Sequence, residues 1–86
     1  MSISTEFTQA AEDVLKLKSK PSQENMLKLY GLYKRVTLGL PPSQEPNRIL
    51  HPRENAKWRS WDSMKRYSRR QAETMYIELV KSLQKI

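Results

Sequence analysis

Residues 27–35 of this 86-residue chain read LKLYGLYKR, and this stretch decides which fold the rest of the sequence supports. The apolar residues in and around it recur about every three or four positions, which predicts a helix over residues 23–38. One stripe of that helix has the character of a core face and consists of Met26, Leu29, Tyr33 and Val36. A second stripe lies about a third of a turn away and consists of Leu27, Tyr30, Gly31 and Lys34.

The second stripe suits neither a core nor a surface that meets only water. A core would exclude the ammonium of Lys34, and a solvated surface would gain nothing from Leu27 and Tyr30. A ligand with a phosphate and an apolar tail would use all three, through charge neutralisation, stacking and aliphatic packing. Gly31 costs about 1 kcal/mol of helix stability relative to Ala, and we interpret it as a point where the ligand approaches the backbone. The simpler alternative, in which Tyr30 covers the core and Lys34 extends into water, stays open from this helix alone.

The rest of the chain divides into further helical stretches. They are predicted over residues 4–18, 53–64 and 68–85. Ser4 and Ser22 precede helical patterns as N-caps, and Ser68 with Gln71 has the pattern of a capping box. The alternation that is typical of strands is absent. We therefore predict an all-α fold, a four-helix bundle that forms one domain over residues 1–86.

One long loop separates the second and third predicted helices. Residues 39–52 contain four of the five prolines, which predicts irregular structure. Gly39, at the start of the loop, is a favourable C-terminal stop for the preceding helix. We expect Leu40, Ile49 and Leu50 to pin the loop to the core.

The composition excludes several kinds of site. The chain has no Cys and one His, which excludes disulfides, thiolate metal sites and multi-histidine centres, so no metal is expected. No pairing of nucleophile and base suggests catalysis, and we predict that the protein is not an enzyme. The N-terminal residues lack the regions of a secretory signal, and no apolar run approaches the roughly 18 residues of a membrane span. We therefore expect a cytoplasmic location.

The net charge of +7 is concentrated in residues 51–86, which carry nine Lys and Arg against four acidic residues. Such an excess predicts a polyanionic partner. One alternative is a small basic nucleic-acid binder, and another is a protein-interaction domain. Phosphate contacts of a nucleic-acid binder would come from Lys65, Arg66, Arg69 and Arg70. These cations do not share one recognition helix with base-reading Asn or Gln, so nucleic acid is not the expected partner.

Taken in order, the motifs of the chain resemble those of the acyl-CoA-binding protein family. They are Phe7-x-x-Ala10-Ala11-x-x-Val14-x-x-Leu17, Pro21, LKLYGLYKRVTLG at 27–39, Pro46, AKWRSW at 56–61, and Ser68-x-x-x-Ala72 followed by Tyr76-Ile77-x-x-Val80. Each motif is weak alone, but together, at family spacing and over essentially the whole chain, they are specific. The resemblance implies a four-helix bundle that binds thioesters of coenzyme A with long fatty acids across its bowl-shaped face.

The resemblance also implies roles for individual residues. Tyr30 and Lys34 match positions that contact the adenosine 3′-phosphate, and Tyr33 matches a position near the adenine. Lys57 matches a lysine of the phosphate cluster, and Tyr76 matches a ligand-contacting tyrosine of the last helix. The candidate ligand site also includes the neighbours Gly31 and Leu32. A wider set adds Ala11, Leu15, Lys20 and Leu27.

Three positions depart from the family pattern. Leu15 stands where many members carry a basic residue, and Asn55 stands where they carry lysine. Arg66 replaces a glycine that is common between the third and fourth helices, which would cost about 1 kcal/mol if the position were left-handed. None of these changes removes the candidate phosphate contacts.

Together these observations predict a non-enzymatic carrier that binds medium- to long-chain fatty acyl-CoA and forms an intracellular pool of it. Burial of a 16-carbon chain has a gross favourable term of order 10 kcal/mol, at about 0.8 kcal/mol per methylene. Contacts to the phosphates would add discrimination against free fatty acid. We expect a monomer without a cofactor, in transient contact with acyl-CoA-using enzymes and membrane surfaces.

Overall fold

The computed structural model describes residues 3–85, and in this range the chain is helical without strands. Its elements are α1 (Thr5–Asp13), η1 (Val14–Lys16), α2 (Gln23–Thr37), α3 (Pro52–Ser63), η2 (Met64–Arg66) and α4 (Arg69–Gln84), where η denotes a single 3₁₀ turn. The all-α prediction with four helices is confirmed. Three predicted helices agree with the structure to within one or two residues at each end, whereas the first was predicted to be longer than it is.

Local capping interactions begin the helices, as predicted. The Ser4 hydroxyl accepts a hydrogen bond from the backbone N–H of Phe7, and Ser22 caps α2 in the same way. The predicted capping box at Ser68 is complete, because Gln71 donates its backbone N–H to the Ser68 hydroxyl at 3.0 Å and accepts from the Ser68 N–H at 2.9 Å. Each cap satisfies a backbone donor that the helix itself leaves free.

The first helix ends early, and this corrects the prediction of a helix over residues 4–18. α1 stops at Asp13, η1 follows, and the next residue, Leu17, has extended backbone angles. The side chain of Leu17 packs against the core in this conformation. Pro21 further disfavours helical geometry at the residue before it. Residues 17–22 therefore cross from α1 to α2 as a non-helical strap.

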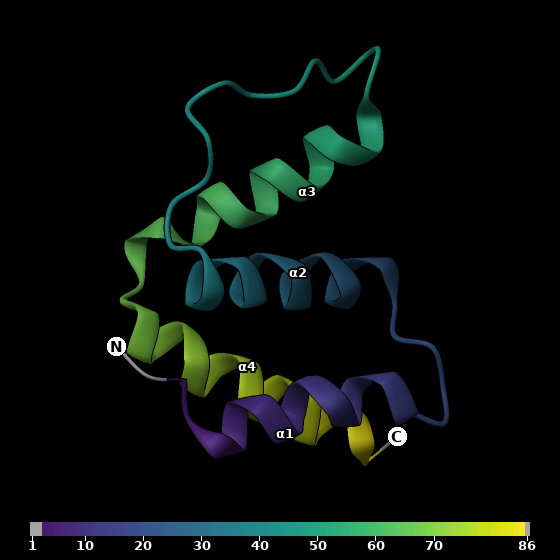
Figure 1. The fold of residues 1–86 in the computed structure, drawn as a ribbon. Helices are drawn as coiled ribbons and strands as arrows, with labels where there is room; N and C mark the ends of the chain where they lie inside the picture. Colours follow the sequence, from purple (N-terminus) through teal and green to yellow (C-terminus); the bar gives the residue numbers. More distant parts are fainter. Residues whose placement is uncertain (1–2, 86) are drawn as a thin grey trace.

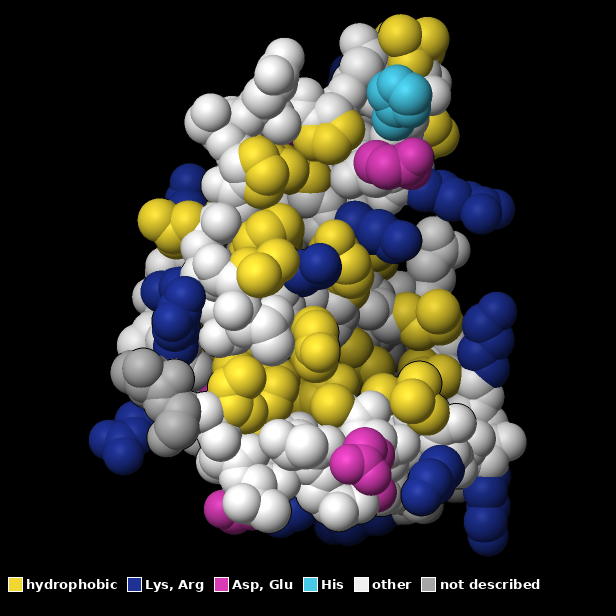
Figure 2. Space-filling view, viewed as in Figure 1, with side chains coloured by type: hydrophobic (Ala, Val, Ile, Leu, Met, Phe, Trp, Pro, Cys, Tyr) yellow, Lys and Arg dark blue, Asp and Glu magenta, His cyan; other side chains and the backbone are white. Residues whose placement is uncertain are grey.

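The helices form a flat arrangement in which α2 is central. α2 packs against α3 on one side and against α4 on the other, and α1 packs against α4. Figure 1 shows α1 and α4 running in the same direction and α2 running against them. The molecule measures 35 × 32 × 17 Å. One broad face, seen in Figure 2, therefore displays α1, α2 and α3 together.

The core lies between α1, α2 and α4. Its buried members are Phe7, Ala10, Leu29, Leu32, Val36, Met64, Ala72, Tyr76, Val80 and Leu83. Leu32 is completely buried, whereas Met26 and Tyr33 of the stripe that was assigned to the core are exposed. The apolar surface of α2 is thus wider than the part that neighbouring helices cover. The uncovered part lies on the broad face of the molecule.

α3 joins α2 by close backbone packing. A Cβ added to Gly31 would lie 2.7 Å from the carbonyl oxygen of Ser60, closer than real Cβ contacts come. The Ser60 hydroxyl also donates a hydrogen bond to the carbonyl oxygen of Leu27. The interpretation of Gly31 as an opening for the ligand is therefore corrected, because α3 occupies the space beside it. The lack of a side chain is what allows the two helices to approach.

Apolar side chains do not pin the loop between α2 and α3, contrary to the prediction. Ile49 and Leu50 are 82% and 73% exposed, and Leu40 is also exposed. The loop begins with Gly39 at a φ of +89°, a left-handed conformation that confirms its predicted role as a stop after α2. Arg66 is not left-handed, since no non-glycine residue in the described range has a positive φ.

Polar side chains of α3 hold this loop instead. The indole N–H of Trp61 donates to the carbonyl oxygen of Gly39 at 2.9 Å, and that of Trp58 donates to Pro42 at 2.8 Å. The buried amide of Asn55 donates to a Glu45 carboxylate oxygen and to the Pro46 carbonyl oxygen, both at 2.7 Å. The loop is therefore ordered by hydrogen bonds that span long stretches of sequence.

Candidate functional site

An open depression of about 340 Å³ lies on the broad face of the molecule. Its walls come from α2, α4, η1 and the strap that joins α1 to α2, and it is lined by Val14, Lys20, Pro21, Met26, Leu29, Tyr30, Tyr33 and Tyr76. Figure 2 shows hydrophobic side chains gathered in this hollow between α2 and α1, with Lys and Arg side chains at its margins. A lining of this kind, with basic groups at the margins, suits a ligand that is apolar at one end and anionic at the other.

Tyr33 and Tyr76 line one side of the depression, and the buried ring of Phe7 packs behind them. The ring centroids of Phe7 and Tyr76 are 4.9 Å apart, and those of Phe7 and Tyr33 are 5.7 Å apart. Tyr76 is only 3% exposed. Burial raises the pKa of Tyr76, and the neighbouring Tyr33 contributes in the same direction. Tyr76 therefore offers a neutral hydroxyl beside an apolar wall.

The ammonium groups of two lysines lie near the ring of Tyr30, which lines the depression. The Nζ atom of Lys34, on α2, lies 5.5 Å from the centre of the Tyr30 ring, and the Nζ atom of Lys57, on α3, lies at the same distance. Lys34 also lies 5.8 Å from the ring of Trp61. Ring faces attract ammonium groups, so Tyr30 helps to hold two cations near each other. Two neighbouring positive charges repel, and a phosphate placed between them would relieve that repulsion.

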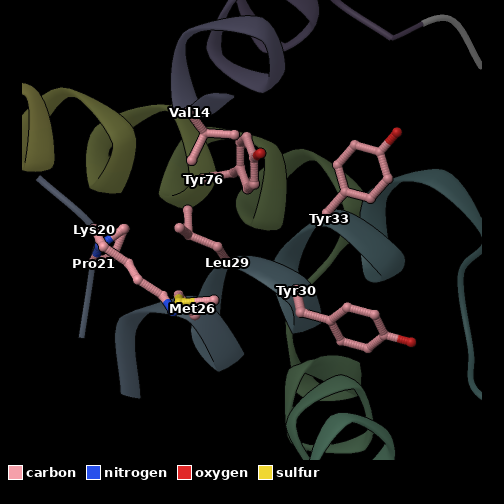
Figure 3. A pocket seen from close by; sticks show the side chains of 8 residues that line it. All are labelled: Val14, Lys20, Pro21, Met26, Leu29, Tyr30, Tyr33 and Tyr76. Atoms are coloured by element: carbon pink, nitrogen blue, oxygen red, sulfur yellow. The ribbon is translucent and has the colours of Figure 1, made fainter. Parts of the chain in front are cut away.

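The structure brings most of the central candidates together. Tyr30, Tyr33, Tyr76 and Lys20 line the depression, and Figure 3 shows the Tyr30 and Tyr33 rings projecting from α2 to the same side. Lys34 and Lys57 stand beside Tyr30 although they belong to different helices. The physical cause is the tight α2–α3 packing, which aligns the Lys57 side of α3 with the Lys34 side of α2.

Other candidates lie elsewhere. Leu32 is wholly buried in the core and Gly31 is buried against α3, so neither offers a side chain to a ligand. The assignment of these two residues to the ligand site stays a prediction, and it could hold only through their backbone atoms. Leu27 and Ala11 are half-buried outside the lining of the depression. Leu15 is 85% exposed and does not line the depression.

Four lining residues were missed by sequence reasoning. They are Val14, Pro21, Met26 and Leu29. Met26 and Leu29 lie on the same stripe as Tyr33, which the periodicity assigned to the core. The signal that could have found them is the surplus of apolar positions on α2, since one stripe is enough to bury a helix against a small bundle.

The described part of the chain lacks two other kinds of feature. Residues 3–85 contain no cluster of three His, Asp or Glu side chains able to hold a metal ion. In the same range, no helix combines the length and the apolar character that a membrane crossing requires.

Known proteins resemble the chain over nearly its full length. A family model described as acyl-CoA-binding protein matches residues 4–80. A Hypsibius protein named for acyl-CoA binding is 41% identical over 83 residues, which cover 96% of this chain and 92% of the relative. The acyl-CoA-binding protein of Saccharomyces cerevisiae is 37% identical over 81 residues, which cover 94% of this chain and 92% of the yeast protein. The crystal structure of Oryza sativa acyl-CoA-binding protein 2 superimposes with a TM-score of 0.89 at 33% identity, covering 98% of this chain and 92% of the rice chain.

Proposed function

The chain belongs to the acyl-CoA-binding protein family, and we propose that it binds medium- to long-chain fatty acyl-CoA on the face that carries the depression. One observation supports this most directly. The ammonium groups of Lys34 on α2 and Lys57 on α3 both lie near the ring of Tyr30, and Tyr30 also lines the apolar depression. Acyl-CoA carries phosphates at one end and a long apolar tail at the other, which matches the two parts of this face.

The anionic end of the ligand belongs with Lys34, Lys57 and Tyr30 in this proposal. Two lysines that approach from different helices can contact one phosphate from two directions, and the Tyr30 hydroxyl can donate to the same group. Lys20, at the margin of the depression, is available for another phosphate of the coenzyme. These cations raise the affinity for the thioester of coenzyme A over that for the free fatty acid.

The apolar part of the ligand belongs with the depression. Met26 and Leu29 of α2 face Val14 and Tyr76 across it. The hollow is open, so a bound chain would cover apolar surface that now meets water, and each buried methylene contributes about 0.8 kcal/mol. Tyr33 stands next to Tyr76, with ring centroids 6.0 Å apart, and can stack on the adenine.

We further propose the role of a carrier and not of a catalyst. The family model describes a binding protein, and the proposed ligand residues are lysines, tyrosines and aliphatic groups without a nucleophile–base pair. The whole chain, residues 1–86, would form one binding domain that acts as a cytoplasmic monomer, forms a pool of acyl-CoA and passes it to enzymes and membranes.

The nucleic-acid alternative gains no support from the basic cluster. Lys65 pairs with Asp62 at 3.3 Å, and the Arg66 guanidinium lies 5.4 Å from the Tyr67 ring centre. Two of the four cations are therefore already engaged within the protein.

Calorimetric titration tests the proposed function. Palmitoyl-CoA should bind one to one, and coenzyme A and palmitate should each bind far more weakly, because each carries only part of the recognised chemistry. A series of acyl chain lengths would define the preference. No heat of binding with any acyl-CoA, or equal affinity for coenzyme A alone, would overturn the proposal.

A further inference from the structure

The ammonium group of Lys34 lies near two aromatic rings that come from different helices. Its Nζ atom is 5.5 Å from the centre of the Tyr30 ring on α2 and 5.8 Å from that of the Trp61 ring on α3. We propose that Trp61 is a positioning residue for ligand binding, which together with Tyr30 holds the Lys34 ammonium in place for a phosphate of the ligand. The effect on binding rests on the proposed function, whereas the placement of Lys34 does not require a ligand.

Hydrogen bonds fix the Trp61 ring relative to the end of α2. Trp61 is only 8% exposed, and its indole N–H donates to the carbonyl oxygen of Gly39 at 2.9 Å. The backbone N–H of Gly39 in turn donates to the carbonyl oxygen of Lys34 at 3.1 Å. This chain of contacts closes on itself, because the Trp61 ring also lies beside the Lys34 ammonium. The indole is therefore tied to the same turn of α2 that carries the lysine.

The two rings hold Lys34 in a way that a carboxylate could not. Lys34 is half-buried, and the ion pairs within residues 3–85 join Arg59 to Glu45 and Lys65 to Asp62. A carboxylate beside Lys34 would offset its positive charge and compete with an incoming phosphate. A ring face attracts an ammonium without cancelling its net charge. The rings therefore leave the charge of Lys34 available to an anionic ligand.

Lys57 provides a contrast within the same site. Its Nζ atom also lies 5.5 Å from the centre of the Tyr30 ring, but its side chain is exposed. Both lysines thus contact Tyr30, and the additional contact of Lys34 is Trp61. A lysine that is free to move loses rotamer freedom when a ligand binds, and this loss lowers the affinity. Because the rings restrict Lys34 before the ligand arrives, less of that loss falls on binding.

Trp61 also anchors the loop between α2 and α3, and Trp58 offers a matched control for that structural role. The indole N–H of Trp58 donates to the carbonyl oxygen of Pro42 in the same loop at 2.8 Å. Trp58 therefore has the same residue type, helix and kind of hydrogen bond as Trp61. Within the described residues, the rings near the Lys34 ammonium are those of Tyr30 and Trp61, and not that of Trp58.

Calorimetric titration with palmitoyl-CoA measures the effect on binding. Trp61→Leu should weaken binding by about threefold to tenfold, the range that one cation–π contact supplies. The same substitution should have little further effect in a protein that already carries Lys34→Gln, because Trp61 acts through Lys34. Trp58→Leu should leave the affinity unchanged. Trp61→Phe keeps a ring without the indole N–H, so it should lose less than Trp61→Leu, and it serves the test if Trp61→Leu does not fold.

Nuclear magnetic resonance tests the placement of Lys34 in the ligand-free protein. Aromatic rings displace the signals of protons that are held above their faces. The Cε protons of Lys34 should therefore resonate away from those of exposed lysines such as Lys57. Trp61→Leu should reduce this displacement, and Trp58→Leu should leave it as it is. A role of Trp61 in loop anchoring alone would not produce this difference between the two variants.

Several outcomes would overturn the proposal. They are an equal loss of affinity in Trp58→Leu, a loss from Trp61→Leu that is just as large in the Lys34→Gln protein, and wild-type Lys34 signals at the position of exposed lysines. Failure of wild-type protein to bind palmitoyl-CoA would overturn the proposed function, and with it the role of Trp61 in binding. The resonance measurement would still decide whether the two rings hold Lys34.

Discussion

Gly31 of α2 lies against the backbone of Ser60 in α3, so closely that a Cβ at Gly31 would come within 2.7 Å of the Ser60 carbonyl oxygen. This contact sets how α3 sits on α2. It also determines that Lys57 of α3 reaches the ring of Tyr30. A residue without a side chain therefore helps to build a site that it does not itself contact.

Gly31→Ala should destabilise the protein by about 1–3 kcal/mol, as overpacking does. In an isolated helix the same substitution would stabilise the helix by about 1 kcal/mol. A loss of stability would therefore show that the close contact with Ser60 outweighs the gain in helix propensity. Urea denaturation measures it. Ser60→Ala should not restore stability in the double variant, because the backbone of Ser60 also blocks the space. Full rescue would mean that only the hydroxyl is in the way.

Lys34→Gln should weaken palmitoyl-CoA binding by about tenfold to a hundredfold, since hydrogen bonds to charged groups contribute about 1.5–3 kcal/mol. Lys57→Gln should have a similar effect. If both lysines contact the 3′-phosphate, each substitution should change little when the ligand is 3′-dephospho-palmitoyl-CoA. Calorimetry with the two ligands measures the coupling.

Lys65→Gln is the control for this pair, because Lys65 is also a surface lysine but pairs with Asp62. Equal losses for all three variants would indicate a general charge effect. Losses that persist with the dephosphorylated ligand would move the contact of Lys34 and Lys57 to another part of the coenzyme.

Stability should decline at alkaline pH through Tyr76. Its pKa is raised above the ordinary value of 10.0, first by burial and then by Tyr33. Below the unfolded pKa both states are protonated and stability is unaffected. Between the unfolded and folded pKa the unfolded state binds fewer protons, so the free energy of unfolding falls as pH rises. Tyr76→Phe should show a shallower decline in denaturation measured across this range, and an unchanged slope would contradict the assignment.

Asn55→Ala should loosen the loop between α2 and α3. The change removes the hydrogen bonds that the buried Asn55 amide donates to the exposed Glu45 carboxylate and to the carbonyl oxygen of the half-buried Pro46. It should lower the free energy of unfolding by about 1–2 kcal/mol, since each hydrogen bond contributes about 0.5–1.5 kcal/mol net. Hydrogen exchange should quicken in residues 40–51 more than in α4. Uniform acceleration throughout the chain would show that the loop and the bundle unfold together.

Acid should loosen the same loop. Hydrogen bonds from Asn55, and then from Arg59, lower the pKa of Glu45 below its ordinary value of 4.5. A lowered folded pKa means that the stabilisation is present above the unfolded pKa and is lost as pH falls through the folded pKa. Glu45→Gln should remove this contribution to the pH dependence of loop exchange, while Glu78→Gln on α4 should not.

The start of each capped helix could be predicted from the sequence because capping is a local interaction. Ser4, Ser22 and Ser68 each bond to a backbone N–H three residues ahead. The core-facing stripe of α4, around Tyr76 and Val80, could also be predicted. Its apolar residues recur at the helical period, and so short a chain has only one core in which to bury them. The mixed stripe of α2 singled out Tyr30 and Lys34 as candidate ligand contacts, and the family resemblance then implied that they contact the 3′-phosphate.

Periodicity did not reveal which apolar surface stays uncovered. Met26 and Tyr33 belong to a stripe with core character, yet both are exposed, because α1 packs chiefly against α4 and leaves this stripe of α2 partly uncovered. The pattern of one helix carries no information about which neighbour will cover it. Leu40, Ile49 and Leu50 were misjudged for a similar reason, since indole and amide donors of α3 hold the loop without them.

The sequence by itself determined the helix class, the capped helix starts and the family, because caps, helical period and motif order depend on residues near one another in the chain. Only the tertiary structure decided that Lys34 and Lys57 meet at Tyr30 and that Gly31 serves helix packing. These relationships depend on distances between separate helices, and such distances are fixed by how closely backbones can approach, which no local pattern specifies.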